Sequence, residues 1–505
     1  MQPPRLAVVS NRLPAVIKRD ENGKTTIQPA SGGLVTALTP VLRDRGGVWI
    51  GWLGTPSGEP KENARFDDLL AQGAPERGFE LKAVSLSPED IEKYYFGFAN
   101  EILWPLFHAL PSRCHFEPSY WRAYEAVNRK FAAAIAQHTR ETDYVWVQDY
   151  HLLLAARELK KSGARRQTGF FLHIPFPPLD LFLQVPWRFA LLDALLEYDL
   201  IGFQTPRDRD NFLQCVNALV DRVQMRRDGQ VLTITAEGRR VRVGAFPISI
   251  DFEGFERLGG SKAVAERARP VHESQPNKKM ILGVDRLDYT KGIPARLLAF
   301  ANTLTRYPEL RKKVTLVQVV VPSRRQVQDY ETLKDEVERL VGEINGRFTE
   351  VGWTPIEYIF RSLSQDELAA YYRSCQVALI TPLKDGMNLV AKEYCASSVD
   401  EDSVLILSEF AGAAAQLAHG ALLVNPHDID GVAEAIHQAL TMDSVETKAR
   451  MRRLRDSIRT DDVFHWAKSY LEAGTLKAGA LEPAAAVENE EFEEAPLLEP
   501  FVPAN

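Results

Sequence analysis

A short turn near residue 385 joins an apolar strand to a helix and carries groups that could bind phosphate. The run Val377–Ile380 predicts a buried strand, and the segment 387–394 predicts a helix, with Asp385 and Gly386 between them. The first turn of a helix leaves backbone N–H groups unpaired, and these groups bind anions. Glu393 lies one to two turns further and supplies an acceptor for sugar or ribose hydroxyls. This pattern predicts a nucleotide diphosphate site.

A second loop, about a hundred residues upstream, carries two cations. Arg286 and Lys291 follow a predicted strand and precede Pro294, which is a good helix opener. An arginine can fork two phosphate oxygens, whereas a lysine acts as a point charge. Ordinary surface charge is the alternative for either residue alone. Since both stand on one loop that should face the turn at residue 385, we predict that they stabilise a leaving diphosphate, and that the chain handles an activated sugar.

Length and composition limit the class of protein. The 505 residues, 45% hydrophobic and 26% charged, predict a globular protein with two domains of roughly 200 to 250 residues each. No apolar run reaches the ~18 residues of a membrane span, and no signal peptide is recognisable, so we expect no membrane association and a cytoplasmic location. The four cysteines lack CxxC spacing, so neither a zinc site nor a disulfide framework is predicted.

The net charge of -7 arises from the end of the chain. Residues 478–505 hold seven glutamates and no lysine or arginine, and without them the basic and acidic counts are both 61. Nucleic acid is therefore not expected as a ligand. We predict an acidic, disordered tail over 478–505, preceded by a helix over 458–477 that packs back on the first domain.

Short β-branched runs alternate with helical patterns, which is typical of parallel α/β construction. We predict two doubly wound, Rossmann-like domains that face each other across a cleft, over residues 1–255 and 256–457, with ligands at the carboxyl ends of the strands. The strands of the second domain begin after the polar stretch 258–278. A helix is predicted over 88–98, with Ser87 as its N-cap and Pro88 at its first position. The predicted strands cover residues 5–10, 48–53, 79–86, 144–148, 168–173, 200–204, 241–247, 279–285, 314–321, 356–360, 377–380, 404–407 and 421–424.

Several familiar signals are missing or weak. The chain has no GxGxxG fingerprint, which argues against a nicotinamide enzyme. The segment 22–25 imitates the end of a P-loop but lacks the first glycine, and it is better interpreted as a hairpin turn. Asp208 and Asp210 stand in the first turn of a predicted helix, where acidic residues favour the helix dipole, so no metal site is predicted there.

A set of motifs in one order resembles a known family. They are Val9-Ser-Asn-Arg12-Leu-Pro, Ser31-Gly-Gly33-Leu-Val-Thr-Ala-Leu, Tyr94-Tyr95, Leu103-Trp104-Pro, Trp146-Val-Gln-Asp149-Tyr-His151, Phe171-Leu-His173-Ile-Pro-Phe-Pro, the Arg286/Lys291 loop, Pro322-Ser-Arg324 and Asp385-Gly-Met-Asn-Leu-Val-Ala-Lys-Glu393. Over residues 5 to 475 they look like the trehalose-6-phosphate synthase family, glycosyltransferase family 20 with the GT-B fold. The resemblance implies transfer of glucose from a nucleotide donor onto glucose 6-phosphate with retention, without metal or cofactor.

The resemblance also implies two sets of ligand-binding residues. The acceptor set is Arg12, Tyr95, Trp104, Asp149 and Arg324, with both arginines on the 6-phosphate. The donor set is Gly32, Gly33, His173, Arg286, Lys291, Asp385, Gly386, Met387, Asn388, Leu389, Val390 and Glu393, and the catalytic residues among them are His173, Arg286, Lys291 and Asp385. From the residues alone, Tyr95 and Trp104 could equally be core aromatics, Gly32 and Gly33 could serve a tight turn, and His173 could be structural.

The resemblance leaves the ligands' finer identity open. UDP-glucose is the first expectation for the donor, with ADP- or GDP-glucose as alternatives. The protein is expected to form a homo-oligomer, and a separate trehalose-6-phosphate phosphatase is expected to act on its product. Gln148 departs from the family's usual histidine. The alternatives are a synthase with another phosphorylated acceptor (glucosylglycerol-phosphate synthase or a C–N-forming pseudoglycosyltransferase), a non-catalytic glucose 6-phosphate sensor, and a generic GT-B enzyme such as glycogen synthase.

Overall fold

The structure is a computed structural model, and it describes residues 4–19, 25–30, 32–56, 66, 68–71, 77–229, 231–236, 238–274, 278–323 and 328–475. The chain divides into two compact units, Met1–Gly474 and Thr475–Asn505. Only Thr475 of the second unit is described, so the predicted tail lies outside the described residues. The boundaries predicted at residues 255, 457 and 477 stay predictions.

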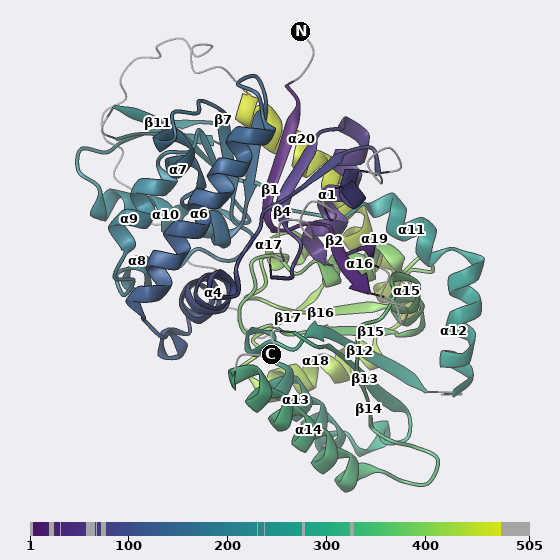
Figure 1. Cartoon of the computed structure of the whole chain (residues 1–505). Coiled ribbons are helices and arrows are strands. Elements are labelled where there is room, and N and C mark those ends of the chain that lie inside the picture. Colours follow the sequence, from purple (N-terminus) through teal and green to yellow (C-terminus); the bar gives the residue numbers. More distant parts are fainter. Residues whose placement is uncertain are drawn as a thin grey trace. The chain divides into compact units, whose positions relative to one another are not determined.

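A nine-stranded sheet forms the first half of the chain (Figure 1). Seven strands run parallel, and β10 and β9 add an antiparallel edge. In spatial order the strands are β5 (Glu80–Ala83), β4 (Val48–Trp52), β1 (Leu6–Arg12), β6 (Tyr144–Gln148), β7 (Gln167–Phe171), β8 (Leu200–Phe203), β11 (Arg239–Ala245), β10 (Val231–Ala236) and β9 (Gln224–Asp228). The central strands are buried along their whole length, which explains why they are continuous apolar runs in the sequence.

A six-stranded parallel sheet forms the second half. Its spatial order is β14 (Ile356–Phe360), β13 (Val314–Val321), β12 (Lys279–Arg286), β15 (Val377–Ile380), β16 (Val404–Ser408) and β17 (Leu422–Val424). If the six strands are numbered 1 to 6 along the chain, starting with β12, their spatial order is 3-2-1-4-5-6, which is the doubly wound arrangement. The strand order reverses between β12 and β15. Ligands of such sheets bind outside the carboxyl ends of the strands at that reversal. The two loops singled out in the sequence leave these two strands.

Helices connect the strands in both halves. Those of the first half are α1 (Gly33–Arg45), α4 (Pro88–Asp90), η1 (Ile91–Leu103), α5 (Trp104–Phe107), η2 (Pro111–Arg113), α6 (Pro118–His138), η3 (Tyr150–Leu152), α7 (Ala155–Lys161), α8 (Leu179–Phe182), α9 (Arg188–Leu195) and α10 (Pro206–Leu219). Those of the second half are α11 (Phe252–Gly259), α12 (Lys262–Ser274), η4 (Tyr289–Lys291), α13 (Ile293–Arg306), η5 (Pro308–Leu310), α14 (Gln328–Phe348), α15 (Gln365–Ser374), α16 (Leu389–Ser397), α17 (Ala414–Leu417), α18 (Ile429–Thr441) and α19 (Ser444–Thr460).

The polar stretch 258–278 contains a helix that was not predicted, α12, which occupies most of it and buries Val264 and Ala268. The helix predicted to end at Phe98 continues as the π-helix η1 to Leu103 and then as α5. The N-cap prediction at Ser87 is confirmed, since its side chain accepts from the Asp90 N–H in a capping box.

The last described helix, α20 (Val463–Thr475), returns to the first sheet (Figure 1). Tyr470 stacks on Trp146 of β6, with ring centroids 4.5 Å apart, and its hydroxyl donates to the carbonyl of Phe170 in β7 at 3.0 Å. The hairpin predicted around residues 22–25 is flanked by two antiparallel strands, β2 (Ala15–Arg19) and β3 (Thr25–Pro29), although its turn lies outside the described residues. Among the described helices, none has the length and apolar character of a membrane span.

Candidate active site

The cations and the carboxylate predicted from the sequence meet at the carboxyl ends of β12 and β15. Lys291 Nζ lies 2.6 Å from Asp385 Oδ2, and both side chains are largely buried. Asn388 Nδ2 donates to the same carboxylate oxygen at 3.1 Å. Burial by itself would raise the pKa of Asp385, but the Lys291 ammonium outweighs it and holds this pKa below its usual value. Asp385 is therefore a charged acceptor beside a fixed cation.

Backbone contacts hold the two loops together. The N–H of Leu383 donates to the carbonyl of Thr290 at 2.8 Å. Gly292 has φ 65°, and a Cβ there would collide with the carbonyl oxygen of Thr381, so this crossing of the two loops requires glycine. Beneath them the fully buried Arg296 pairs with Asp285 of β12 and donates to Thr381 at 3.1 Å. The position of Lys291 is thus set from both strands.

The helix after Asp385 begins two residues later than predicted. Asn388 adopts a left-handed conformation (φ 81°) as the N-cap, and its side chain accepts from the Ala391 N–H at 3.2 Å, so α16 begins at Leu389 and not at Met387. Glu393 lies one turn along α16, where Tyr372 donates to its carboxylate at 2.8 Å. Burial raises the pKa of Glu393.

The start of α1 lies against the start of α16. Gly32 is the N-cap of α1 with φ 145°, and a Cβ on Gly33 would be 3.1 Å from Cδ1 of Leu389. Two helix N-termini, one from each sheet, therefore lie side by side, and each carries unpaired N–H groups and the positive end of a helix dipole. A diphosphate beside them would receive hydrogen bonds from both halves of the chain.

Gly386 brings the loop after β15 against His173, which follows β7. A Cβ on Gly386 would collide with the carbonyl oxygen of His173. The N–H of His173 donates to Asp149 Oδ1 at 3.1 Å, and Asp149 itself has a φ of 73°. This conformation is uncommon for a non-glycine residue, and the hydrogen bond from His173 is one of the contacts of Asp149 there. Burial lowers the pKa of His173 to about 3, so its imidazole is neutral at physiological pH.

Arg12 lies at the end of β1 on an aromatic surface. Its guanidinium carbon is 4.5 Å from the centroid of the Trp52 ring and 6.0 Å from that of Tyr95. A Cβ on Gly54 would collide with the guanidinium, so Gly54 makes room for it. The side chain of Arg12 is exposed to solvent, as an anion-binding arginine must be before its ligand arrives.

Ring contacts connect Arg12 to Arg286. Tyr95 stacks on His151 with centroids 5.8 Å apart, and the His151 ring is 4.0 Å from that of Tyr150. Tyr150 is 5.8 Å from Trp104, and the Arg286 guanidinium lies 5.7 Å from the Trp104 ring. Trp104 is 5% exposed, so it is largely a core aromatic, which agrees with the alternative interpretation. Its ring also packs against the Arg286 guanidinium. A residue predicted for the acceptor, Trp104, therefore contacts one predicted for the donor, Arg286.

Residues 4–475 match the family described as Glycosyltransferase family 20. The chain belongs to this family. It is 43% identical over 471 residues to a trehalose-6-phosphate synthase of Mycobacterium sp. (strain JLS), covering 92% of this chain and 95% of that one, and equally identical to that of Mycolicibacterium smegmatis, covering 92% and 91%.

Solved structures agree with this family assignment. An alpha,alpha-trehalose-phosphate synthase (UDP-forming) from Burkholderia xenovorans in complex with glucose-6-phosphate superposes with a TM-score of 0.84 at 36% identity, covering 93% of this chain and 99% of that one. A structure described as trehalose-6-phosphate from E. coli bound with UDP-2-fluoro glucose gives 0.83 at 35% identity, covering 94% and 99%. The predicted fold, α/β with two doubly wound sheets of the GT-B class, is confirmed.

Two residues of this family 20 chain that contact predicted site residues lie outside the sequence motifs. The Trp52 ring packs against the Arg12 guanidinium, and the buried His108 ring lies against that of Trp104 with centroids 4.2 Å apart. Burial lowers the pKa of His108 to about 4, against the pull of the nearby Asp288 carboxylate. The spacing Trp104 to His108, one helical turn, was the signal that could have revealed this contact.

One predicted acceptor residue cannot be placed. Arg324 lies outside the described residues, so the convergence of Arg12 and Arg324 on one phosphate stays a prediction. No group of three histidine, cysteine, aspartate or glutamate side chains within the described ranges could hold a metal ion.

Proposed function

We propose that this family 20 enzyme transfers glucose from a nucleotide-activated donor to glucose 6-phosphate with retention and makes α,α-trehalose 6-phosphate. The observation that carries the proposal is the meeting of two helix N-termini beside the Lys291–Asp385 pair, adjoining the Arg12 aromatic surface. The relatives named as trehalose-6-phosphate synthases support the same reaction. UDP-glucose is the preferred donor, because two similar structures are described as UDP-forming or bound to a UDP sugar.

The donor diphosphate would lie at the starts of α1 and α16. As the bond between the glucose C1 and the phosphate oxygen breaks, negative charge collects on the leaving diphosphate. Lys291 and Arg286 neutralise that charge, and the N–H groups after Gly33 and Gly386 donate to the phosphate oxygens. This stabilisation is greatest in the transition state and so accelerates the reaction.

The remaining donor contacts fix the sugar and the ribose. The Asp385 carboxylate would accept hydrogen bonds from the glucose hydroxyls. Backbone N–H groups of residues 386–390 would donate to them, and these residues are Gly386, Met387, Asn388, Leu389 and Val390. Glu393 would accept from the ribose hydroxyls, a role supported by its place one turn along α16. His173, neutral and already hydrogen-bonded, orients the donor and is not assigned an acid or base role.

The acceptor would lie on the surface of Arg12 and Tyr95. Arg12 and Arg324 would clamp the 6-phosphate, Tyr95 and Trp104 would shape its surroundings, and Asp149 would accept from sugar hydroxyls. The acceptor hydroxyl oxygen bonds to C1 of the donor glucose, and its proton passes to the leaving phosphate oxygen. No carboxylate is assigned as a nucleophile, in keeping with front-face departure and attack.

The product would be the phosphorylated disaccharide, which is the substrate that a trehalose-6-phosphate phosphatase, the partner proposed for this enzyme, would take. A homo-oligomeric state is part of this proposal and is testable by light scattering. A solution mass equal to that of one 56.8 kDa chain would exclude it.

A panel assay tests the proposal. The protein is incubated with UDP-, ADP- and GDP-glucose, each with glucose 6-phosphate, glycerol 3-phosphate or glucose, and products are identified by mass. We expect a hexose disaccharide monophosphate from glucose 6-phosphate and the UDP donor. Binding of glucose 6-phosphate with no product from any donor would leave only the sensor alternative.

A substitution of Arg324 tests the acceptor set. Arg324→Ala should raise the KM for glucose 6-phosphate roughly tenfold to a hundredfold, since a charge-assisted clamp contributes ~1.5 to 3 kcal/mol. The KM for the donor should stay within about twofold under the same reasoning. An equal rise in both KM values would refute the acceptor assignment.

A further inference from the structure

Lys392 is a buried cation that the proposed reaction does not use. It lies in α16 next to Glu393, and none of its surface is exposed. Its Nζ donates to the backbone carbonyl of Ile248 at 2.8 Å. Burial lowers the pKa of Lys392 to about 7, with the Asp461 carboxylate opposing the shift. Burying an ammonium group is costly, so a chain that retains one there gains something from its contact.

Ile248 lies where the chain passes from the first sheet to the second. The passage covers residues 246–251, between β11 and α11. The chain also returns beside it, because the N–H of Val463 at the start of α20 donates to the carbonyl of Ile250 at 2.9 Å. The carbonyl that Lys392 binds therefore belongs to the segment that joins the donor half to the acceptor half.

The N–H of the same residue points toward the active site of the first half. It donates to Gln204 Oε1 at 2.9 Å, just beyond the end of β8. This contact fixes the orientation of the Gln204 amide, because the oxygen accepts from a backbone donor. The amide nitrogen then lies 3.4 Å from Nδ1 of His173 and can only donate to it.

The direction of that contact determines the tautomer of His173. Since Nδ1 accepts, the neutral ring carries its proton on Nε2, which donates to Gln148 Oε1 at 2.8 Å. Gln148 Nε2 in turn lies 3.4 Å from the carbonyl of Trp146. Both ring nitrogens are thus used, and every donor in the series has an acceptor. Gln148, the residue that departs from the family's usual histidine, is well suited to this direction.

We propose that Lys392 is a positioning residue for the His173 imidazole. It acts through the backbone of Ile248. Lys392 donates to the carbonyl of this residue, and the N–H of the same residue orients the Gln204 amide. Helix α16, which begins at the proposed donor-binding turn, is in this way connected to the His173 imidazole, which follows a strand of the other sheet. The proposal rests on the function proposed above, since it assigns His173 to the donor sugar.

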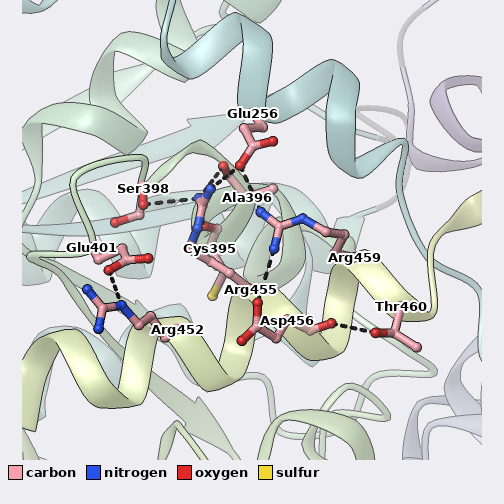
Figure 2. A network of polar contacts seen from close by, with 10 residues as sticks. All are labelled: Glu256, Cys395, Ala396, Ser398, Glu401, Arg452, Arg455, Asp456, Arg459 and Thr460. Carbon is pink, nitrogen blue, oxygen red and sulfur yellow. Dashed lines mark hydrogen bonds and ion pairs between the residues drawn. The ribbon is translucent and has the colours of Figure 1, made fainter.

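Arg455 provides a matched control (Figure 2). It is a buried cation of α19 that binds α16 from outside, since it donates to the carbonyls of Cys395 at 2.9 Å and Ala396 at 2.6 Å, at the carboxyl end of α16. Its other nitrogen pairs with Glu256 of α11. Arg455 therefore stabilises α16, as Lys392 does, but it belongs to a separate network at the far end of the helix.

The test uses full-length protein with 15N-labelled histidine. The ring signals of His173 are identified among the ten histidines by their loss in His173→Asn, and the multiple-bond 1H–15N pattern reports the tautomer. We expect the Nε2–H tautomer in the wild type and a mixed or shifted signal in Lys392→Met. With saturating substrates, kcat of Lys392→Met should fall about tenfold, the effect of one buried hydrogen bond, while both KM values change less than about twofold.

Double-mutant cycles with Gln204→Leu complete the test. The effect of Lys392→Met on kcat should shrink severalfold when Gln204 is already leucine, whereas the effect of Arg455→Met should not change. If Lys392→Met does not fold, the same readouts are taken on Lys392→Gln, whose shorter, neutral side chain removes the ammonium. Both kcat and the His173 signal should then change, and no change in either overturns the proposal. A kcat loss with an unchanged His173 spectrum, or equal coupling of Lys392 and Arg455 to Gln204, overturns the proposal. Wild-type protein that forms no disaccharide yet holds the Nε2–H tautomer would refute the proposed function alone.

Discussion

The ion pair of Lys291 and Asp385 is the part of the donor site on which the proposed chemistry depends most. Lys291→Met removes the cation that pairs with Asp385 and leaves this carboxylate with the Asn388 amide as a hydrogen-bond donor. We expect kcat/KM for the donor to fall by about a hundredfold or more, as for the loss of one group that stabilises transition-state charge. Steady-state kinetics at saturating acceptor measure the effect.

Lys313→Met is the control, since Lys313 is an exposed lysine of the same half. It should leave kcat/KM within about twofold of the wild-type value. Comparable losses in the two variants would mean that Lys291 acts only through general surface charge.

His108 predicts how stability depends on pH. Its pKa is about 4 in the folded chain against 6.5 for the free side chain, because burial disfavours the charged ring by more than the Trp104 carbonyl and the Asp288 carboxylate favour it. Below pH 6.5 His108 takes up a proton in the unfolded state but stays neutral in the folded state. The free energy of unfolding therefore falls as the pH drops, and this loss is complete near pH 4. The shift corresponds to about 3 kcal/mol at ~1.4 kcal/mol per pKa unit.

Urea unfolding at pH 7, 5.5 and 4.5 checks this expectation. His108→Gln should show a shallower loss of unfolding free energy over this range than the wild type, while His419→Gln, at an exposed position, should follow the wild type. Identical pH slopes for wild type and His108→Gln would refute the argument.

At the scale of elements, glycines set how closely the loops approach one another. Gly386→Ala would force a Cβ into the His173 carbonyl and push the donor turn away from the first sheet. We expect kcat to fall about a hundredfold, since small misplacements of reacting groups are costly. Gly346→Ala in α14, where a Cβ meets nothing within 4 Å, should keep kcat and raise stability by up to about 1 kcal/mol. Retained activity in Gly386→Ala would contradict the packing described.

The sequence predicted the central strands well because burial on both faces leaves a continuous apolar run. The predicted ranges 144–148, 314–321, 356–360 and 377–380 coincide with β6, β13, β14 and β15. The strands β9 and β10 were not predicted. The polar β9, with two arginines in five residues, resembles a loop until its antiparallel pairing is known. The segment of β10 alternates apolar residues with threonine, which is typical of a half-buried strand, so this pattern could have revealed it.

The same contrast holds for the site. Lys291 and Asp385 could be predicted, because charged residues directly after buried parallel strands must meet at one edge of a sheet. The contact of Trp52 with Arg12, and that of Gln204 with His173, join residues whose spacing along the chain carries no periodic signal. Such pairs follow from the order of strands in the sheet, which the sequence pattern alone leaves open.

At the scale of the whole molecule, the first sheet depends on the end of the chain. Trp466 and Tyr470 of α20 are buried against β6 and β7, and removing such an aromatic costs about 3 to 5 kcal/mol. A chain that ends at Asp461 should therefore fail to fold, whereas one that ends at Thr475 should keep the Tm and kcat of the full chain. Thermal unfolding followed by circular dichroism distinguishes these outcomes, and a folded, active chain ending at Asp461 would contradict this role of α20.

We propose that one active site, built from both sheets, transfers glucose from a UDP donor to glucose 6-phosphate and keeps the anomeric configuration. The most direct measurement is a 13C NMR time course with UDP-glucose labelled at C1 and unlabelled glucose 6-phosphate. We expect the label to move into an α,α-linked disaccharide phosphate as UDP is released. A label that ends in free glucose, in a β-linked product or in unchanged donor would contradict it.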